Sequence, residues 1–184
     1  VTLDIISHGR LILGIGAGWY KREFDAYGIP YEGRVSRMRE VVEIVKKLWT
    51  EDSVDYEGET YKLKGAVCSP KPVQKPHPPI WIAAEKPRML RIAAEIGDGW
   101  ITVNSKVNDF RRKWSFIQDH AAKVGRDGSD IETACYMYAS LAWTSEEAWR
   151  IAERDILPER RRAMNLDLSL RELGEVCLIG DPEE

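Results

Sequence analysis

Short apolar segments alternate with amphipathic segments along almost the whole chain, and this alternation constrains the fold more than any other feature. Arg10 to Gly16 is an apolar run that ends in glycines, which predicts a buried strand. Arg34 to Thr50 carries apolar residues at spacings of three and four, which predicts a helix. Further strands are predicted at 80–84, 99–103, 131–143 and 176–179, and further helices from Pro87, from Val107 and after Thr144. The alternation indicates an α/β fold in which helices cover a parallel sheet.

Two architectures satisfy this pattern, an open doubly wound sheet and a closed barrel. Five parallel strands suffice for an open sheet, whereas a complete (β/α)8 barrel needs eight strands and about 250 residues. Residues 54–63, on both sides of Gly58, interrupt the alternation as a predicted β-hairpin. The proline-rich stretch 69–79 is predicted to be a rigid extended connector. We predict a single domain over 1–184 with the hairpin as an insertion.

Both ends of the chain have the pattern of interrupted elements. Val1 to Ile6 resembles the last turn of a helix that stops at residues 7–9. At the other end, Asp181 and Pro182 followed by two glutamates form a typical helix start. We therefore expect the sequence to be part of a longer domain, truncated at both ends.

Composition argues against several kinds of partner. The formal net charge of -3 predicts no basic surface for nucleic acid or an anionic membrane. No apolar stretch reaches the ~20 residues of a membrane span. The three cysteines are widely separated, which suits a reducing cytoplasm, and His8, His77 and His120 share no metal-ligand spacing. We expect a cytoplasmic protein that acts on a small molecule and holds no metal.

The glycine-rich segment 14–18 follows the first predicted strand and is the first candidate ligand site. A dinucleotide-binding loop needs a third glycine at its sixth position and an immediate helix. Trp19 occupies that position, and the next clear helix is predicted near Arg34. A turn that lets backbone approach a flat ligand at the carboxyl end of a barrel strand fits better, with a tight turn without any ligand as the alternative.

Two further predicted strands end in residues that suit a ligand. The segment 83–87 (AAEKP) leads directly into a helix start, where free N–H groups and the positive end of the helix dipole suit a phosphate. Lys86 adds positive charge there, whereas Glu85 would repel a phosphate unless it turns outward. Lys106, after the third strand, is a candidate for an anionic group, with simple exposure to solvent as its ordinary role. These residues indicate ligand-binding loops and no particular reaction.

Three longer stretches carry a common pattern: TLDIISHGRLILGIGAGWYKREFDAYGIP at 2–30, KKLWTEDSVDYEGETYKLKGAVCSPKPVQKPHPPIWIAAEKPRMLRIAAEIGDGWI at 46–101, and the closing LIGDPEE. Together they resemble one family, the luciferase-like monooxygenases, and within it the F420-dependent class. The resemblance preserves order and spacing over nearly the whole chain. It implies a partial (β/α)8 TIM barrel with a small hairpin insertion. The strands predicted from 10–16 to 131–143 would be the fourth to seventh, and 176–179 would lead to the eighth.

The resemblance implies a cofactor site at the carboxyl ends of these strands, for FMN or the deazaflavin F420. The residues near the cofactor ring would be Gly16, Ala17 and Gly18. The residues that hold its phosphate would be Ala84, Glu85, Lys86 and Met89. Many relatives have GGSG at 83–86 where this chain has AAEK, so that Glu85 stands near the phosphate.

The resemblance also implies a pocket beside the cofactor. Val103 and Lys106 match positions that line the pocket of the sixth strand, where sugar-phosphate users of the class bind their anion, so Val103 would contact the cofactor and Lys106 the substrate. Trp19, a second candidate for substrate binding, stands where some F420-dependent relatives carry a catalytic glutamate. The catalytic group is therefore not assigned.

The family resemblance predicts an enzyme, a flavin- or deazaflavin-dependent oxidoreductase, in which the cofactor carries the chemistry. F420-dependent hydride transfer is the favoured reaction, and FMN-dependent monooxygenation is the alternative. A different hypothesis is a truncated, non-catalytic barrel that serves as a binding or assembly module. The uncovered strand edges of a partial barrel also predict a homo-oligomer. An open-sheet nucleotide-binding protein, based on Gly14–Gly18, is a third hypothesis.

Overall fold

The computed structural model describes residues 1–164 and 167–183, and the chain divides into two compact units. The first unit comprises residues 1–101 and 116–133. The second comprises residues 102–115 and 134–184. The described structure starts with α1 (Thr2–Ile6), which ends at its C-cap Ser7, within the predicted stop at residues 7–9.

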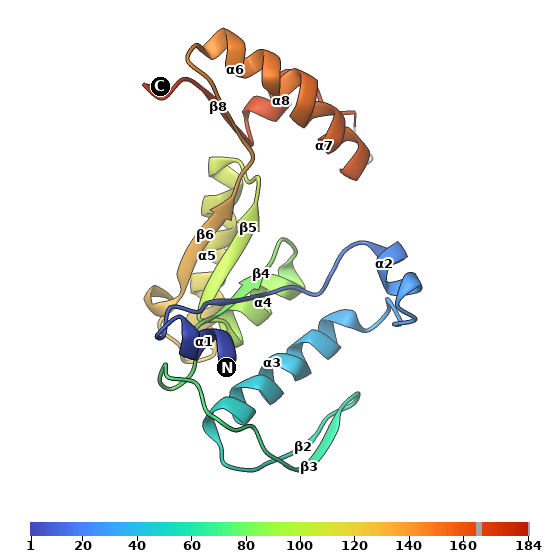
Figure 1. The fold of residues 1–184 in the computed structure, drawn as a ribbon, viewed down its shortest axis with the longest axis vertical. Helices are drawn as coiled ribbons and strands as arrows, with labels where there is room; N and C mark the ends of the chain where they lie inside the picture. Colours follow the sequence, from blue (N-terminus) through green and yellow to red (C-terminus); the bar gives the residue numbers. More distant parts are fainter. Residues whose placement is uncertain (165–166, 184) are drawn as a thin grey trace. The chain divides into compact units, whose positions relative to one another are not determined.

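A four-stranded sheet with the order β1-β4-β5-β6 organises the chain (Figure 1). These strands are β1 (Leu13–Ile15), β4 (Ile80–Ala83), β5 (Gly99–Val103) and β6 (Glu132–Tyr136). β1 pairs in parallel with β4 from Leu13↔Ile80 to Ile15↔Ile82, and β4 pairs in parallel with β5. The strands follow one another in chain order apart from the hairpin, as they do in a barrel, without the reversal of a doubly wound sheet. The described residues form no closed barrel.

Two helices of the first unit cover one face of the sheet. α3 (Arg34–Thr50) has the predicted bounds and buries Met38, Val42 and Ile44. α4 (Pro87–Ile96) begins with proline at its first turn, where no N–H is needed, and packs its apolar stripe on β4. On β4, Ile80 and Ile82 are fully buried, whereas Ala83 is exposed. Each buried isoleucine contributes roughly 1.5–3 kcal/mol, so apolar burial on this face holds the helices against the sheet.

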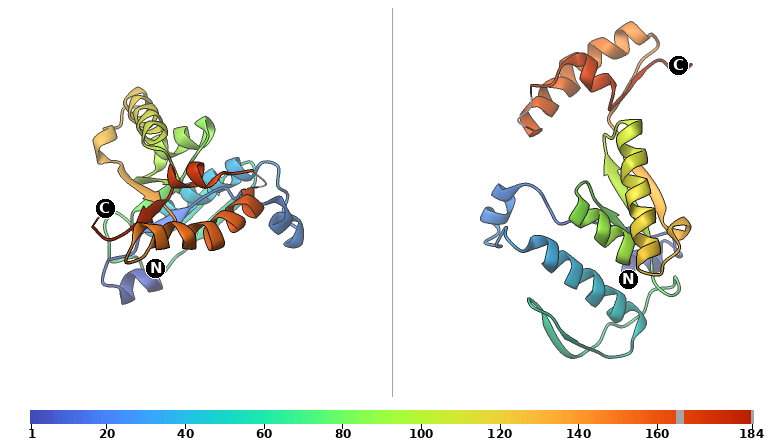
Figure 2. Two further views of the ribbon diagram at one scale, coloured as in Figure 1. Left: turned by 90° about the horizontal axis from the view of Figure 1, so that it is seen from above. Right: turned by 180° about the vertical axis from the view of Figure 1, so that it is seen from behind.

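The predicted hairpin is present and lies along α3 (Figure 2). β2 (Val54–Glu57) and β3 (Lys62–Ala66) pair antiparallel. The second strand was predicted at 60–63 but begins two residues later, because residues 58–61 form the turn. In that turn the Gly58 N–H donates to the Tyr61 carbonyl at 2.9 Å.

One short helix, α2 (Lys21–Ala26), was not predicted from the sequence. The prediction placed the first helix after the glycine turn near Arg34. Its six residues include no buried side chain, so hydrophobic periodicity gave no signal. A Lys21–Asp25 ion pair at 2.7 Å has the i,i+4 spacing that supports a helix.

The prediction of one strand over 131–143 is wrong. The segment divides into β6 and β7 (Ala139–Leu141), and β7 pairs in parallel with β8 (Leu178–Gly180) in a separate sheet. The division occurs at Tyr138, whose N–H donates to the Asn104 side-chain oxygen at 3.3 Å and whose carbonyl accepts from the Leu178 N–H at 2.9 Å. Tyr138 therefore lies between the two short strands, and its carbonyl accepts the first hydrogen bond of the β7–β8 ladder.

The helix predicted after Thr144 continues past Pro158. α6 (Ser145–Ile151) continues through a π-helical turn (Ala152–Ile156) into α7 (Leu157–Met164). The wider π turn accommodates the proline, which lacks an N–H for the preceding helical turn. α5 (Val107–Lys123), a 3₁₀ turn (Gly128–Asp130) and α8 (Leu170–Gly174) complete the elements. The core of this second unit contains Ala152, Leu157, Leu173 and Cys177.

Candidate functional site

The glycine turn and the end of β4 lie side by side at the carboxyl edge of the sheet. The β1–β4 register pairs Ile15 with Ile82, which places the next residues, Gly16 and Ala83, opposite each other. A Cβ added to Gly16 would lie 3.3 Å from the Ala83 Cβ, and both residues are exposed. Small side chains at this edge therefore leave a flat surface that a planar ligand can approach.

The loop after Gly16 is held in a defined shape. Gly18 has φ +78°, and a Cβ there would lie 2.8 Å from the Phe24 ring, so glycine is required for both backbone and packing reasons. The Gly18 carbonyl accepts from Arg34 Nε at 3.0 Å, and the Tyr31 hydroxyl donates to the Trp19 carbonyl at 3.1 Å. Trp19 itself is 69% exposed, beside Tyr20 at a ring distance of 5.3 Å. The loop backbone is fixed while an aromatic ring stands in solvent.

At the junction between β4 and α4, Ala84 is a structural connection. Its N–H donates to the Ile101 carbonyl at 3.0 Å, and its carbonyl accepts from the Trp100 indole at 2.9 Å. Ala84 is 3% exposed. Its predicted ligand role therefore depends on its small size rather than on a free backbone group.

The first turn of α4 suits an anion. Lys86 is the N-cap residue, and no side chain within residues 1–164 and 167–183 caps this helix end. The first N–H groups of a helix have no partner within it and carry the positive end of the dipole. Lys86 and Glu85 are exposed and Met89 is half-buried, so one charge of each sign flanks the helix start.

In the second unit, the two predicted residues after β5 have different surroundings. Val103 is the last residue of β5 and is 41% exposed. Lys106 forms an ion pair with Glu175, and this hydrogen bond and charge raise the pKa of Lys106. Lys106 and Glu175 line a pocket of ≈ 330 Å³ together with Val107, Asn108 and Asp109, and Val103 is not part of its lining. Sequence reasoning missed Glu175, because 69 positions separate it from Lys106.

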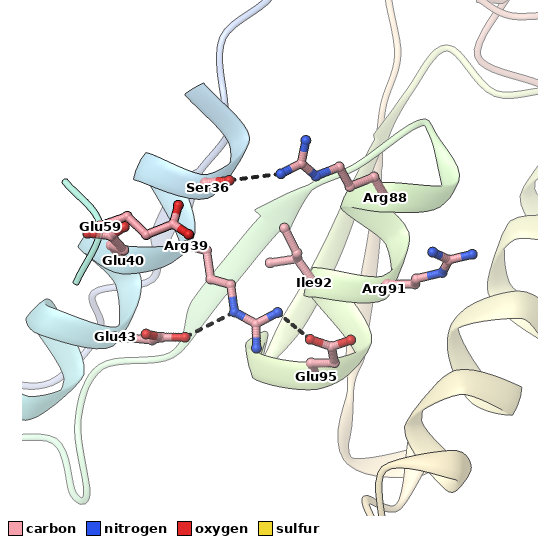
Figure 3. Close-up of a pocket in the computed structure, with 9 residues that line it drawn as sticks. All are labelled: Ser36, Arg39, Glu40, Glu43, Glu59, Arg88, Arg91, Ile92 and Glu95. Carbon is pink, nitrogen blue, oxygen red and sulfur yellow. Dashed lines mark hydrogen bonds and ion pairs between the residues drawn. The ribbon is translucent and has the colours of Figure 1, made fainter. Parts of the chain in front are cut away.

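A cluster of charged side chains lies elsewhere, in a pocket of ≈ 350 Å³ between α3 and α4 (Figure 3). Arg39 donates to Glu43 at 3.0 Å and to Glu95 at 2.5 Å, and Glu95 also contacts His120 at 2.9 Å. Burial raises the pKa of Glu95, but the hydrogen bonds from His120 and Arg39 outweigh it and hold that pKa below its ordinary value. Burial and the hydrogen bond to Glu43 raise the pKa of Tyr56 to about 12. These charges have partners and connect α3, α4, α5 and the hairpin.

No three His, Cys, Asp or Glu side chains in the described part of the chain are placed to hold a metal ion. None of the helices in residues 1–164 and 167–183 combines the length and apolarity needed to span a bilayer.

Comparison with known proteins identifies the class. The fold matches monooxygenase RslO1 from Streptomyces bottropensis with a TM-score of 0.83 at 29% identity, covering 99% of this chain and 57% of that one. The family model for luciferase-like monooxygenases matches residues 1–184. The chain belongs to the luciferase-like monooxygenase family, whose solved members are TIM-barrel enzymes.

Curated relatives include enzymes of both cofactor types. The chain is 40% identical over 140 residues to 5,10-methylenetetrahydromethanopterin reductase of Archaeoglobus fulgidus, covering 76% of this chain and 41% of that protein. It is 34% identical to F420-dependent glucose-6-phosphate dehydrogenase of Segniliparus rotundus (71% and 40% covered). It is 26% identical to FMNH(2)-dependent dimethylsulfone monooxygenase of Pseudomonas putida (89% and 45% covered). The chain spans less than half the length of each of these relatives.

Proposed function

We propose that this protein is an F420-dependent oxidoreductase that acts on a small-molecule substrate. One observation carries the proposal: the glycine turn at Gly16 and the helix start at Lys86 open at the same carboxyl edge of the parallel strands β1 and β4. Parallel α/β folds bind their ligands at this edge. The F420-dependent glucose-6-phosphate dehydrogenase that is 34% identical to the chain supports the choice of F420.

The residues at the edge fit such a cofactor. A planar ring needs a surface without projecting side chains, and Gly16 beside Ala83 provides one. A phosphate needs donors and positive charge, which the first turn of α4 and Lys86 provide. Glu85 opposes the phosphate, and Arg88 of the same turn does not offset its charge there, because Arg88 donates to the Ser36 hydroxyl at 2.8 Å in the pocket between α3 and α4.

Each group would have a distinct task in the reaction. When bound, F420 would supply hydride-transfer chemistry. Gly16 and Ala17 would let the ring lie against the backbone, and the fixed Gly18 turn would set its height. Lys86 and the N–H groups of α4 would hold the phosphate and so fix the ring by its tail. Trp19 would cover the ring and exclude water from the substrate side.

Direct titration tests this proposal. F420 and FMN are added separately to the purified protein, and cofactor fluorescence reports binding. We expect micromolar F420 binding, tighter than FMN binding, and a loss of about fivefold in F420 affinity for Lys86→Met. Lys64→Met removes the same charge from the exposed hairpin and should leave the affinity unchanged. Absence of micromolar binding by both cofactors would overturn the proposal.

FMN-dependent monooxygenation is the second candidate. It is favoured by the structural match to monooxygenase RslO1 and by the dimethylsulfone monooxygenase, which aligns over 89% of the chain. In the same titration, FMN binding that exceeds F420 binding would select this candidate. Self-association and a cytoplasmic location stay predictions, and light scattering of the purified protein would test the first.

A further inference from the structure

Lys106, which the sequence predicted to bind an anionic group, already forms an ion pair within the protein. Lys106 lies between β5 and α5 in the second unit, and its ammonium contacts the Glu175 carboxylate. The two side chains are 52% and 44% exposed, so the pair lies at the surface of its pocket rather than in the core. A parallel strand followed by a helix presents such a position to ligands.

The whole pocket has an unfavourable charge for an anion. Its charged lining residues are Lys106, Asp109 and Glu175, which carry one positive and two negative charges. Arg112 pairs with Asp109 at 2.8 Å but does not line the pocket. An anionic ligand would therefore have to displace Glu175 from Lys106 and then remain close to two carboxylates, at a Coulomb cost for each.

Glu175 is held in place by its own element. α8 begins with a capping box in which Ser169 and Glu172 exchange hydrogen bonds. Its Leu173 is fully buried, and the Glu175 N–H donates to the Glu172 carbonyl at 3.3 Å. The backbone at Glu175 is thus fixed by a cap and a core contact, which reduces the entropy cost of the ion pair.

We propose that Glu175 determines substrate class by neutralising Lys106, so that this pocket takes an uncharged substrate and rejects phosphorylated or carboxylated ones. The inference rests on the proposed function, because that function makes the pocket a substrate site. Glu175 acts by forming an ion pair with the Lys106 ammonium, and the Asp109 carboxylate adds to the repulsion of an anionic ligand.

A chemical-shift titration with inorganic phosphate at fixed ionic strength, without cofactor, tests the pocket directly. Glu175→Gln should bind phosphate about fivefold more tightly than the unsubstituted protein. Glu146→Gln removes one negative charge from the same unit, where it pairs with Arg150 instead, and should leave phosphate affinity unchanged. Lys106→Met combined with Glu175→Gln should abolish the gain.

Two outcomes would overturn the inference. One is equal phosphate affinity in Glu175→Gln and Glu146→Gln, and the other is a gain that persists without Lys106. The cofactor titrations described above use separate samples. Loss of cofactor binding with an intact Glu175 effect would therefore contradict the proposed function, whereas cofactor binding with no Glu175 effect would contradict this inference alone.

Discussion

The pocket between α3 and α4 and the carboxyl edge of β1 and β4 belong to the same compact unit and differ in chemistry. The pocket is lined mainly by charged side chains, among which Arg39 connects two glutamates. The edge presents Gly16 and Ala83, with the backbone groups of Ala84 already engaged. In this unit the charged side chains lie in the pocket, where they connect α3 and α4. The small side chains lie at the carboxyl edge of the sheet, where they leave room for a ligand.

A cluster of charged side chains and a surface with room for a ligand therefore need not coincide. A carboxylate whose hydrogen bonds are satisfied by neighbours has little capacity left for a ligand. Glu40 is an example, since its carboxylate accepts the N–H groups of Thr60 at 3.1 Å and Tyr61 at 3.0 Å. Substitutions in the pocket should change stability, and substitutions at the edge should change cofactor affinity.

The largest expected effect is on stability, from Glu40→Ala. Glu40 is 7% exposed, and its loss removes the acceptor for two N–H groups in the hairpin turn. We expect the free energy of unfolding to fall by about 2 kcal/mol in urea titrations. Glu59→Ala, an exposed acid that lines the same pocket, should change it by less than about 0.5 kcal/mol. Equal losses of unfolding free energy in the two variants would show that the hydrogen bonds between Glu40 and the hairpin turn do not contribute beyond the loss of a negative charge.

An intermediate effect on binding is expected from Gly16→Leu. The new side chain would project from the flat surface where the cofactor ring is proposed to lie, and F420 affinity should fall about tenfold, or ~1.4 kcal/mol. Gly16→Ala is the matched control, because it adds the same Cβ 3.3 Å from the Ala83 Cβ without further bulk. Fluorescence titration would compare the two. If leucine and alanine bind F420 equally, the ring does not lie at this edge.

The regular elements of the first unit could be predicted from the sequence because local signals and tertiary packing agree there. Arg34–Thr50 and Gly99–Val103 have the predicted bounds, since their apolar spacing matches the face that the fold buries. Prediction failed where packing gives no periodic signal. α2 buries nothing, and the segment 131–143 is divided by long-range hydrogen bonds at Tyr138.

The candidate site was predicted only in part. Strand order brings Gly16 beside Ala83, as expected for residues that follow parallel strands. The partner of Lys106 was beyond prediction, because an ion pair between residues 69 positions apart depends on how α8 packs. The network around Arg39 and Glu95 was missed for the same reason, although the Arg39–Glu43 spacing was visible.

The smallest expected effect concerns pH and Glu95. Its pKa is lowered in the folded state, so its contribution to stability is present above its ordinary pKa near 4.5 and is lost as pH falls through the folded value. We expect the unfolding free energy of the unsubstituted protein to fall more steeply between about pH 5 and pH 3 than that of Glu95→Gln. The two curves should converge at the acid end, because protonated glutamic acid and glutamine are both uncharged. His120→Gln keeps a hydrogen-bond donor near Glu95 but removes the imidazole. The slope of its stability curve should lie between those of the unsubstituted protein and Glu95→Gln. Parallel curves for all three proteins would show that the Glu95 network contributes no pH-dependent stability, and the contrast between pocket and edge would then rest on Glu40 alone.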